Sequence, residues 1–363
     1  MPTRRISSPP APTPGEPDLG ARLLQIIERF ASRRLLVVGD LIADEFIYGE
    51  VARVSREAPV LILKYDATAV VPGGAGNAAS NVAALGGRAW LAGMVGADGE
   101  GRRLLASFPR GVDRSLVVRE RTYPTPVKTR ILAGGIHAAR QQVVRIDREP
   151  GWPVRETIGR ALTARLKPAL ARCDAVLLSD YGSGLVTPEL AARLRHALGA
   201  RRRTVPILVD SRYRMLDYRG LTACTPNESE VEQALGGPIG DNGALERAGR
   251  TLLRKMGMPA VLVTRGSRGM ALFEPGRPTA HVPIYGSDEV TDVTGAGDTV
   301  MATFGLALAS GASFYEAARL ANYAGGLVVM KRGTATVSAA ELADAVRSQR
   351  QADRTAAVRG KGR

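Results

Sequence analysis

The segment 292–300 combines a turn of small residues with a carboxylate, Asp298, and leads into an apolar run that ends at Leu308. This pattern predicts a loop that opens into a helix, where the first backbone N–H groups lack an acceptor and attract anions. These amides belong to Gly295, Ala296 and Gly297. An anion-binding turn beside a base suits transfer of a phosphoryl group to a hydroxyl. The alternative is an ordinary helix start in which Asp298 or Thr299 is only a cap.

A second glycine-rich turn, Pro72-Gly73-Gly74-Ala-Gly-Asn77, precedes a segment with a helical pattern over residues 78–85. Glycines allow a ligand to approach the backbone closely, and the Asn77 amide can donate hydrogen bonds to hydroxyls and accept them. The chain contains no Gly-x4-Gly-Lys-Ser/Thr motif, which excludes a P-loop. A dinucleotide site is disfavoured because the turn has no suitable acidic residue after a following strand.

Two further motifs lie in the C-terminal half. Asn227 and Glu230 are three residues apart at a predicted helix start, so both side chains can face one ligand. Glu230 suits orienting water around Mg²⁺, although the same spacing is typical of a capping box. The segment from Thr264 through Gly266 to Gly269 is a glycine turn after an apolar run. It is either a contact for a nucleotide phosphate or a simple hairpin turn.

The elements that carry these motifs alternate. Short apolar runs that end in polar residues predict buried parallel strands at 34–40, 175–180, 205–210 and 260–264. Helical patterns occupy 19–30, 188–198 and 229–235, among others. Alternating strands and helices imply an open, mostly parallel sheet covered on both faces, with ligands at the C-terminal strand ends. Polar residues at those ends are Asp40, Asp180, Asp210 and Thr264.

Two regions, about 46–71 and 125–147, instead predict extended antiparallel strands of a small accessory sheet. Such a sheet near the strand ends suits a lid that excludes water, or a dimerisation element, or both. Its basic residues include Arg53, Lys128, Arg130, Arg140 and Arg145. These are more cations than a neutral sugar needs, so one or more is a candidate for pairing with a substrate phosphate. The alternative is a solvated charged face.

Composition narrows the class of protein. The 363 residues include 45% hydrophobic residues and two cysteines, so a disulfide framework is excluded and a reducing cytoplasm is favoured. The net charge is +15, and residues 347–363 contain six basic residues against one acid. No ladder of aromatic and basic residues points to nucleic acid, and we expect none as a partner. Residues 1–20 read as a disordered tail without a signal peptide, and no apolar stretch is long enough to span a membrane.

In this order, the motifs resemble those of the ribokinase-like sugar kinases, the PfkB family. The resemblance rests on Gly73-Gly-Ala-Gly-Asn77, Asn227-x-x-Glu230, Thr264-x-Gly-x-x-Gly269, Asp292 to Asp298, and Asn322 in a small-residue helix. It implies a three-layer α/β/α sandwich with a mostly parallel central sheet and a small antiparallel β lid. The kinase domain would cover residues 21–340, with a basic C-terminal tail at 341–363.

Other segments look like those of the D-glycero-β-D-manno-heptose 7-phosphate 1-kinases. They include Arg53-Val-Ser-Arg-Glu-Ala-Pro-Val60, Arg140-Gln-Gln-Val-Val-Arg-Ile-Asp147, Ser179-Asp-Tyr181 and Lys331-Arg-Gly-Thr-Ala-Thr-Val337. The substrate implied is a heptose phosphate. Ribose, fructose, a hexose phosphate or a nucleoside remain alternatives within the same family, and a non-catalytic sugar- or nucleotide-binding regulator on this scaffold is a third possibility.

The resemblance also implies roles for single residues. Asp298 would accept the proton of the sugar hydroxyl, with the Gly295, Ala296 and Gly297 amides on the phosphoryl group. Residues expected to bind the substrate are Asp40, Asp44, Arg53, Gly73, Gly74, Asn77, Lys128, Arg130 and Arg145. Residues expected around ATP and Mg²⁺ are Asn227, Glu230, Thr264, Gly266, Gly269 and Asn322. Glu230 would hold the metal through water, and Asp292 is a candidate ligand of a monovalent cation such as K⁺. We expect a homodimer formed through the lid.

Overall fold

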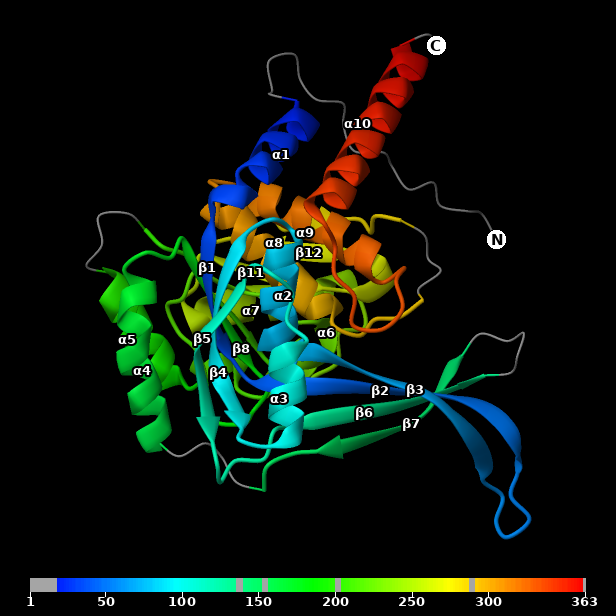
Figure 1. The fold of residues 1–363 in the computed structure, drawn as a ribbon. Helices are drawn as coiled ribbons and strands as arrows, with labels where there is room; N and C mark the ends of the chain where they lie inside the picture. The colour runs from blue at the N-terminus through cyan, green and yellow to red at the C-terminus, as the bar shows by residue number, and fades with distance from the viewer. Residues whose placement is uncertain (1–17, 135–139, 152–155, 200–203, 287–290, 362–363) are drawn as a thin grey trace.

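The computed structural model describes residues 18–134, 140–151, 156–199, 204–286 and 291–361 (Figure 1). A central sheet contains β1 (Arg34–Gly39), β4 (Arg88–Gly96), β5 (Val112–Glu120), β8 (Ala175–Asp180), β9 (Ile207–Ser211), β10 (Ala223–Cys224), β11 (Ala260–Thr264), β12 (Met270–Phe273) and β13 (Ala280–Val282). Their order is β13-β12-β11-β10-β9-β8-β1-β4-β5. From β5 to β11 neighbouring strands pair in parallel, whereas β12 pairs antiparallel with both β11 and β13.

Helices cover both faces of this sheet. One face packs α1 (Leu19–Glu28), α2 (Ala75–Ala84), α3 (Gly99–Ala106), α8 (Ala296–Ala309), α9 (Phe314–Val328) and α10 (Ala339–Lys361). The other packs α4 (Glu156–Leu170), α5 (Pro188–Gly199), α6 (Glu228–Leu235) and α7 (Asn242–Met256). Short 3₁₀ turns occur at Phe30–Ser32, Met215–Asp217 and Gly266–Arg268.

Strand β1 shows why both faces are covered. Leu35 and Val37 lie in the core on one side, and Leu36 and Val38 lie in the core on the other. All four are fully buried, as a parallel strand with apolar residues at successive positions requires. The predicted three-layer α/β/α fold is therefore confirmed, together with the strands expected at 34–40, 175–180, 205–210 and 260–264.

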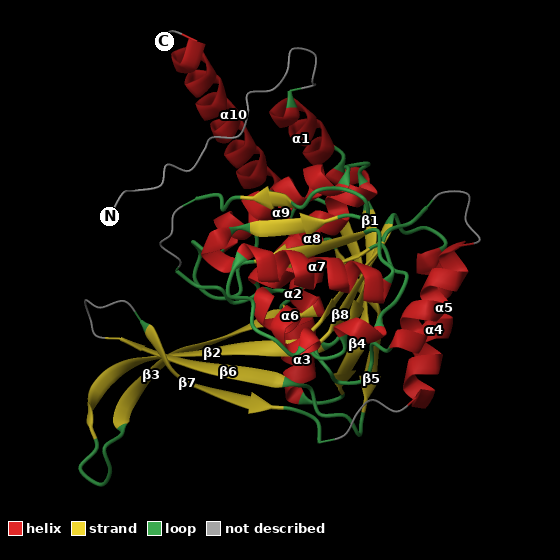
Figure 2. Ribbon diagram, turned by 180° about the vertical axis from the view of Figure 1, so that it is seen from behind, coloured by secondary structure: helices red, strands yellow, loops and turns green. Residues whose placement is uncertain are grey.

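The accessory sheet projects from the body as a long ribbon (Figures 1 and 2). It contains β2 (Leu41–Val54), β3 (Leu61–Gly74), β6 (Val127–Gly134) and β7 (Gln141–Arg148), in the order β3-β2-β6-β7. The outer pairs are antiparallel, while β2 and β6 run parallel. Its first two strands extend beyond the expected 46–71. Only Asp40 separates β1 from β2, and β3 runs directly into α2, so the sheet begins at the C-terminal end of β1.

The two ends of the described chain pack together, as α1 and α10 project side by side in both views (Figures 1 and 2). The boundary expected at 340 falls inside α10, since Leu342 and Val346 are buried in the core. Asp18 pairs with Arg350 at 2.7 Å and with Arg354 at 2.9 Å, which neutralises part of the basic segment. Residues 1–17, most of the expected tail, lie outside the described residues. Among the described residues, no helix is both long and apolar enough to cross a membrane.

Candidate active site

The predicted turn and helix at 292–308 are confirmed. Helix α8 begins after the N-cap residue Gly295, whose φ of 77° favours glycine, and neither Asp298 nor Thr299 caps the helix. The alternative of a simple side-chain cap is therefore wrong. The Ala296 N–H donates to the Val293 carbonyl at 3.2 Å, so it is partly occupied within the turn. Gly297 is the second helical residue, and its amide remains the better placed donor to an anion.

Asp298 occupies the third position of α8 and is only 3% exposed. Its Oδ2 accepts a hydrogen bond from Asn77 Nδ2 at 2.9 Å, and its Oδ1 accepts one from the Tyr181 hydroxyl at 3.2 Å. Burial raises the pKa of Asp298 from 3.8 to about 7, against the opposing effect of these two hydrogen bonds. A carboxylate that titrates near neutral pH has the basicity expected of a general base.

Asn77 belongs to a buried polar chain behind Asp298. Its Nδ2 group also donates to the Gly295 carbonyl at 3.2 Å, so both amide hydrogens are used within the protein. Its Oδ1 accepts from Asn81 at 3.0 Å, and Asn81 accepts from the Thr299 hydroxyl at 3.0 Å. Asn77 stays a predicted contact of a sugar hydroxyl. In this structure it orients the carboxylate of Asp298.

Asp40 follows β1 and is held by the loop after β8. Its Oδ2 accepts the backbone N–H groups of Tyr181 at 2.8 Å and Ser183 at 3.2 Å, and its Oδ1 accepts the Ser183 hydroxyl. Burial raises the pKa of Asp40 to about 6. The loop therefore fixes the Asp40 carboxylate beside Tyr181, whose hydroxyl contacts Asp298.

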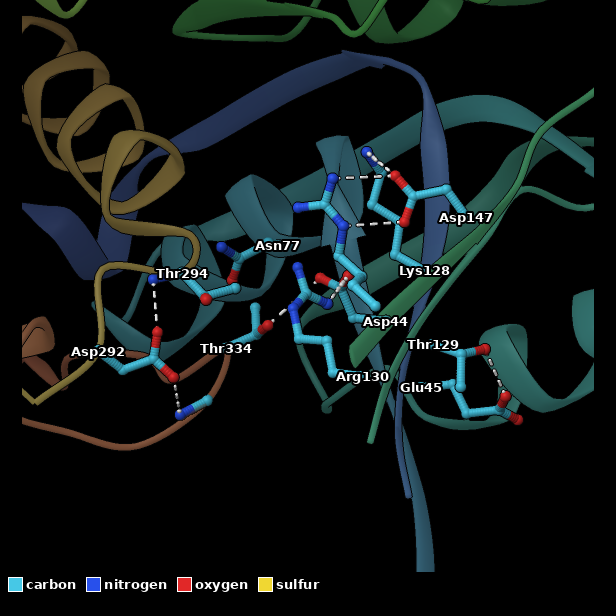
Figure 3. Close-up of polar contacts among 12 residues, drawn as sticks. Asp44, Glu45, Asn77, Lys128, Thr129, Arg130, Asp147, Asp292, Thr294 and Thr334 are labelled. Carbon is cyan, nitrogen blue, oxygen red and sulfur yellow. Dashed lines mark hydrogen bonds and ion pairs between the residues drawn. The ribbon is translucent and has the colours of Figure 1, made fainter. Parts of the chain in front are cut away.

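Asp44 lies four residues further on, in β2. Its Oδ1 pairs with Arg130 at 2.6 Å, and its Oδ2 accepts the Thr334 hydroxyl at 3.3 Å (Figure 3). A Cβ atom at Gly73 would lie 2.5 Å from Asp44 Oδ2, and Gly74 has a φ of 58°. Gly73 is therefore required by the close packing of β3 against β2, and Gly74 by its positive φ and by the Asp40 carbonyl, which lies 2.5 Å from a Cβ atom at that position.

Strand register places three of the expected lid cations on one face with Asp44. Lys128 pairs in register with Asp44 and Asp147, and Arg145 with Arg130. On this face the Lys128 ammonium is 3.7 Å from Asp147, and Arg145 donates to Asp147 at 2.9 Å (Figure 3). These cations are already paired with carboxylates within the lid.

Arg53 does not join that group. It lies nine residues beyond Asp44 on the same strand, which corresponds to roughly 30 Å along β2. Its side chain is exposed near the end of the ribbon. Arg53 therefore lies apart from the other predicted substrate residues of its own chain, because the strand continues away from the body without turning back. Its role in substrate binding stays a prediction.

Asn227 and Glu230 form a complete capping box at the start of α6. The Glu230 N–H donates to Asn227 Oδ1 at 2.9 Å, and the Asn227 N–H donates to Glu230 Oε2 at 2.9 Å. The capping alternative is thus present in the structure. Asn227 also forms a parallel bridge with Thr264, so the predicted nucleotide residues of α6 and β11 are neighbours.

Carboxylates gather between these loops and α8. Burial, followed by the charge of Glu230 and then of Asp298, raises the pKa of Asp210 well above its usual range. Burial likewise raises the pKa of Glu230. A cation would relieve this repulsion, and Mg²⁺ is commonly held by one or two carboxylates and several waters, so the residues fit the expected ion. Among the described residues, no group of three acidic, histidine or cysteine side chains forms a metal site.

The remaining nucleotide candidates lie in the turn after β11 and on α9. Gly266 and Gly269 have φ values of 55° and 78°, and a Cβ atom at Gly269 would collide with the Val282 carbonyl. Asn322, on α9, donates to the Pro283 carbonyl at 2.8 Å. Gly269 and Asn322 therefore support the same segment at the end of β13.

Asp292 connects two loops. Its carboxylate accepts the N–H groups of Thr294 at 2.9 Å and Gly333 at 3.0 Å (Figure 3). This fixes the loop before α8 against the loop after α9. A role in holding a monovalent cation stays a prediction.

Three residues of this site were not predicted as site residues from the sequence. They are Tyr181, Ser183 and Thr334. Tyr181 directly follows Asp180, which was noted with Asp210 as a strand end, so the search of strand ends could have included it. Thr334 lies in a segment already noted for its family resemblance, but nothing local indicates that it reaches Asp44.

Comparison with known proteins identifies the family of this chain. Residues 32–341 match the family described as pfkB family carbohydrate kinase. The chain is 42% identical over 323 residues to the bifunctional protein HldE of Trichlorobacter lovleyi, covering 88% of this chain and 64% of that protein. It is 44% identical over 309 residues to the bifunctional protein HldE of Geobacter metallireducens, covering 85% and 61%. The chain thus spans slightly less than two thirds of these relatives.

Solved structures share the fold at low identity. Arabidopsis thaliana ribokinase complexed with ribose and ATP aligns with a TM-score of 0.66 at 22% identity, over 86% of this chain and 98% of that one. Escherichia coli phosphofructokinase-2 in complex with potassium aligns with a TM-score of 0.68 at 18% identity, over 87% and 98%. The ribokinase-like architecture expected from the motifs is confirmed. The chain belongs to the pfkB family of carbohydrate kinases, which are phosphotransferases with a hydroxyl group as acceptor.

Proposed function

We propose that the protein transfers the γ-phosphoryl group of ATP to the 1-hydroxyl of D-glycero-β-D-manno-heptose 7-phosphate, giving the 1,7-bisphosphate. The observation that carries the chemistry is the buried Asp298 carboxylate at the start of α8, with a pKa of about 7. The heptose assignment is supported by the resemblance of the lid segments to heptose 7-phosphate kinases and by the identity to proteins named HldE.

The proposed step moves one proton and one phosphoryl group. The sugar hydroxyl gives its proton to Asp298, its oxygen bonds to the γ-phosphorus, and the bond from that phosphorus to the ADP oxygen breaks. The Gly297 amide and the positive end of the α8 dipole stabilise charge on the transferring group. Bound ATP supplies the phosphoryl group, and Mg²⁺ neutralises the phosphates. Glu230 and Asp210 are the residues proposed to hold that ion, in part through water.

The charge on the lid supports a phosphorylated sugar only weakly. The face with Asp44 carries three cations, Lys128, Arg130 and Arg145, against two carboxylates, Asp44 and Asp147. Glu149 also lies 3.8 Å from the Lys128 ammonium, so three carboxylates balance the three cations and leave no surplus charge for a phosphate. Because each cation is paired, a kinase of an unphosphorylated sugar is the second candidate.

A substrate panel separates these candidates. The purified protein is given ATP and Mg²⁺ with the heptose 7-phosphate, the free heptose, ribose, fructose, fructose 6-phosphate or a nucleoside, and ADP release is measured. The heptose 7-phosphate should give the highest kcat/KM, with a new anomeric phosphate in the ³¹P spectrum. A higher kcat/KM for the free heptose would discard the phosphate assignment. The same ADP release in a mock purification from cells without the expression plasmid would identify a contaminating kinase.

We also propose that the protein forms a homodimer through the lid. Exposed apolar side chains lie on its strands and on the β2–β3 connection, namely Val51, Val54, Val60, Leu61, Tyr65, Val143, Val144 and Ile146. A sheet with so many exposed apolar residues suits an interface. Sedimentation velocity should give a dimer that Val144→Asp converts to monomer, and a monomeric wild-type protein at micromolar concentration would reject the proposal.

Dependence on ions tests the remaining assignments. EDTA should abolish ADP release and added Mg²⁺ should restore it. Replacing choline chloride by KCl should raise the rate if Asp292 helps to hold a monovalent cation, and equal rates in the two salts would remove that role.

A further inference from the structure

Tyr181 makes two contacts that join the substrate side of the site to the base. Its backbone N–H donates to Asp40 Oδ2 at 2.8 Å, and its hydroxyl donates to Asp298 Oδ1 at 3.2 Å. The neighbouring turn is built to hold it there, since Gly182 has a φ of 92° and donates its N–H to Asp180 Oδ1 at 3.1 Å. The position of the hydroxyl is therefore set by the backbone after β8 as well as by its own side chain.

The Asp298 carboxylate sits among groups that oppose its ionisation. Asp44 from β2, Glu230 from α6 and Asp210 from β9 are the carboxylates that interact with it. The hydrogen-bond donors that favour the ionised form are Asn77 from α2 and Tyr181 from the end of β8. Asn77 acts on one oxygen and Tyr181 on the other, so neither donor can replace its counterpart.

We propose that Tyr181 is a positioning residue, whose hydroxyl holds the Asp298 carboxylate in place for the sugar hydroxyl and favours its charged form. The inference rests on the proposed base role of Asp298. A hydroxyl donating to a carboxylate stabilises the charged form, and this is the ionisation state that can accept a proton. The remaining lone pairs of the two carboxylate oxygens stay free for the substrate.

Tyr181→Phe tests the proposal with little change in shape. Loss of one hydrogen bond to a charged group should move the acid limb of the kcat profile upward by about one pH unit. On the acid side of the limb kcat then falls by up to about tenfold relative to the wild type, whereas at pH 9 most of the rate returns. The KM for the sugar should stay within about twofold.

Tyr218→Phe is the matched control. Its hydroxyl is also shielded from solvent and donates to Asp180 at 2.7 Å, with the Val186 carbonyl oxygen 3.1 Å away, and it does not contact Asp298. This variant should lose stability without moving the acid limb. If Tyr218→Phe moved the acid limb as far as Tyr181→Phe does, the shift would reflect a general loss of packing around the site, and the proposal would fail.

Two measurements keep the test independent of the substrate assignment. The ¹³C carboxyl signal of Asp298, identified by its absence in Asp298→Asn, can be titrated in the ligand-free protein, and it should titrate at higher pH in Tyr181→Phe. If that variant does not fold, 3-fluorotyrosine at position 181 is a stronger donor of similar size and should move the titration to lower pH. An unchanged titration, or a loss of kcat by the same factor at pH 7 and pH 9, refutes the role of Tyr181. Inactivity of the wild type on every sugar would instead refute the proposed function.

Discussion

Asp298→Asn should lower activity and raise stability at the same time. The amide has nearly the same shape, can still accept from Asn77, and can donate to the Tyr181 oxygen, so the fold should be kept. Loss of a general base should lower kcat by about 10² to 10⁴ while KM changes little. The free energy of unfolding should rise, because the wild-type carboxylate is buried although its ionised form is more stable in water.

The size and sign of the stability change follow from linkage. The pKa of Asp298 rises from 3.8 when unfolded to about 7 when folded, so the folded state binds the extra proton between these values. The contribution of Asp298 to the free energy of unfolding of the wild type therefore falls as pH rises from about 4 to 7, by about 1.4 kcal/mol per pH unit. The asparagine variant lacks this loss. Its advantage over the wild type should grow by roughly 3 kcal/mol between pH 5 and pH 8.

Urea denaturation of both proteins at pH 5, 6, 7 and 8 measures that slope. A hydrogen bond that the amide itself forms or breaks adds the same offset at each pH, so the change with pH isolates the carboxylate. A difference in unfolding free energy that is constant from pH 5 to pH 8 would refute the idea that Asp298 titrates near neutrality. A fall in kcat of less than tenfold would refute its role as the base.

Three other substitutions test the surroundings of the site. Thr299→Val removes the donor to Asn81, and it should destabilise the fold by about 1 to 3 kcal/mol in urea and lower kcat severalfold. Gly269→Ala places a Cβ atom against the β13 backbone at a φ of 78°, and it should lower the unfolding free energy by more than about 1 kcal/mol, as chemical denaturation would show. Glu228→Gln weakens the pairing with Arg265 at 2.9 Å between α6 and the turn after β11, so the KM for ATP should rise while that for the sugar stays the same.

The local pattern of apolar and polar residues was enough to predict most of the architecture. Apolar runs that end in Asp or Thr marked the strands around Asp40, Asp180 and Asp210, because each strand is buried on both faces and its polar end opens at the sheet edge. The turn at Gly295 was equally readable, since glycine at a positive φ and a following apolar run define a helix start within a few residues.

The length of the lid strands and the contacts of the C-terminal segment were harder to predict from the sequence. Periodicity indicated extended strands, but the path of β2 determined that Arg53 lies roughly 30 Å from Asp44 along the strand. The basic segment after 340 was expected as a tail, whereas α10 docks through Leu342 and Val346 and pairs with Asp18 from the other end of the chain. Such contacts depend on packing between distant elements and leave no local signal.

The same distinction holds at the catalytic centre. By itself the sequence determined that Asp298 stands at a glycine-rich helix start, because that feature is encoded within one turn of chain. Only the tertiary structure decided that Asn77, 221 residues away, and Tyr181, 117 residues away, donate to its two oxygens. The order of β8 and β1 in the sheet and the packing of α2 against α8 bring these donors together, and the resulting burial turns an ordinary carboxylate into a base that titrates near neutral pH.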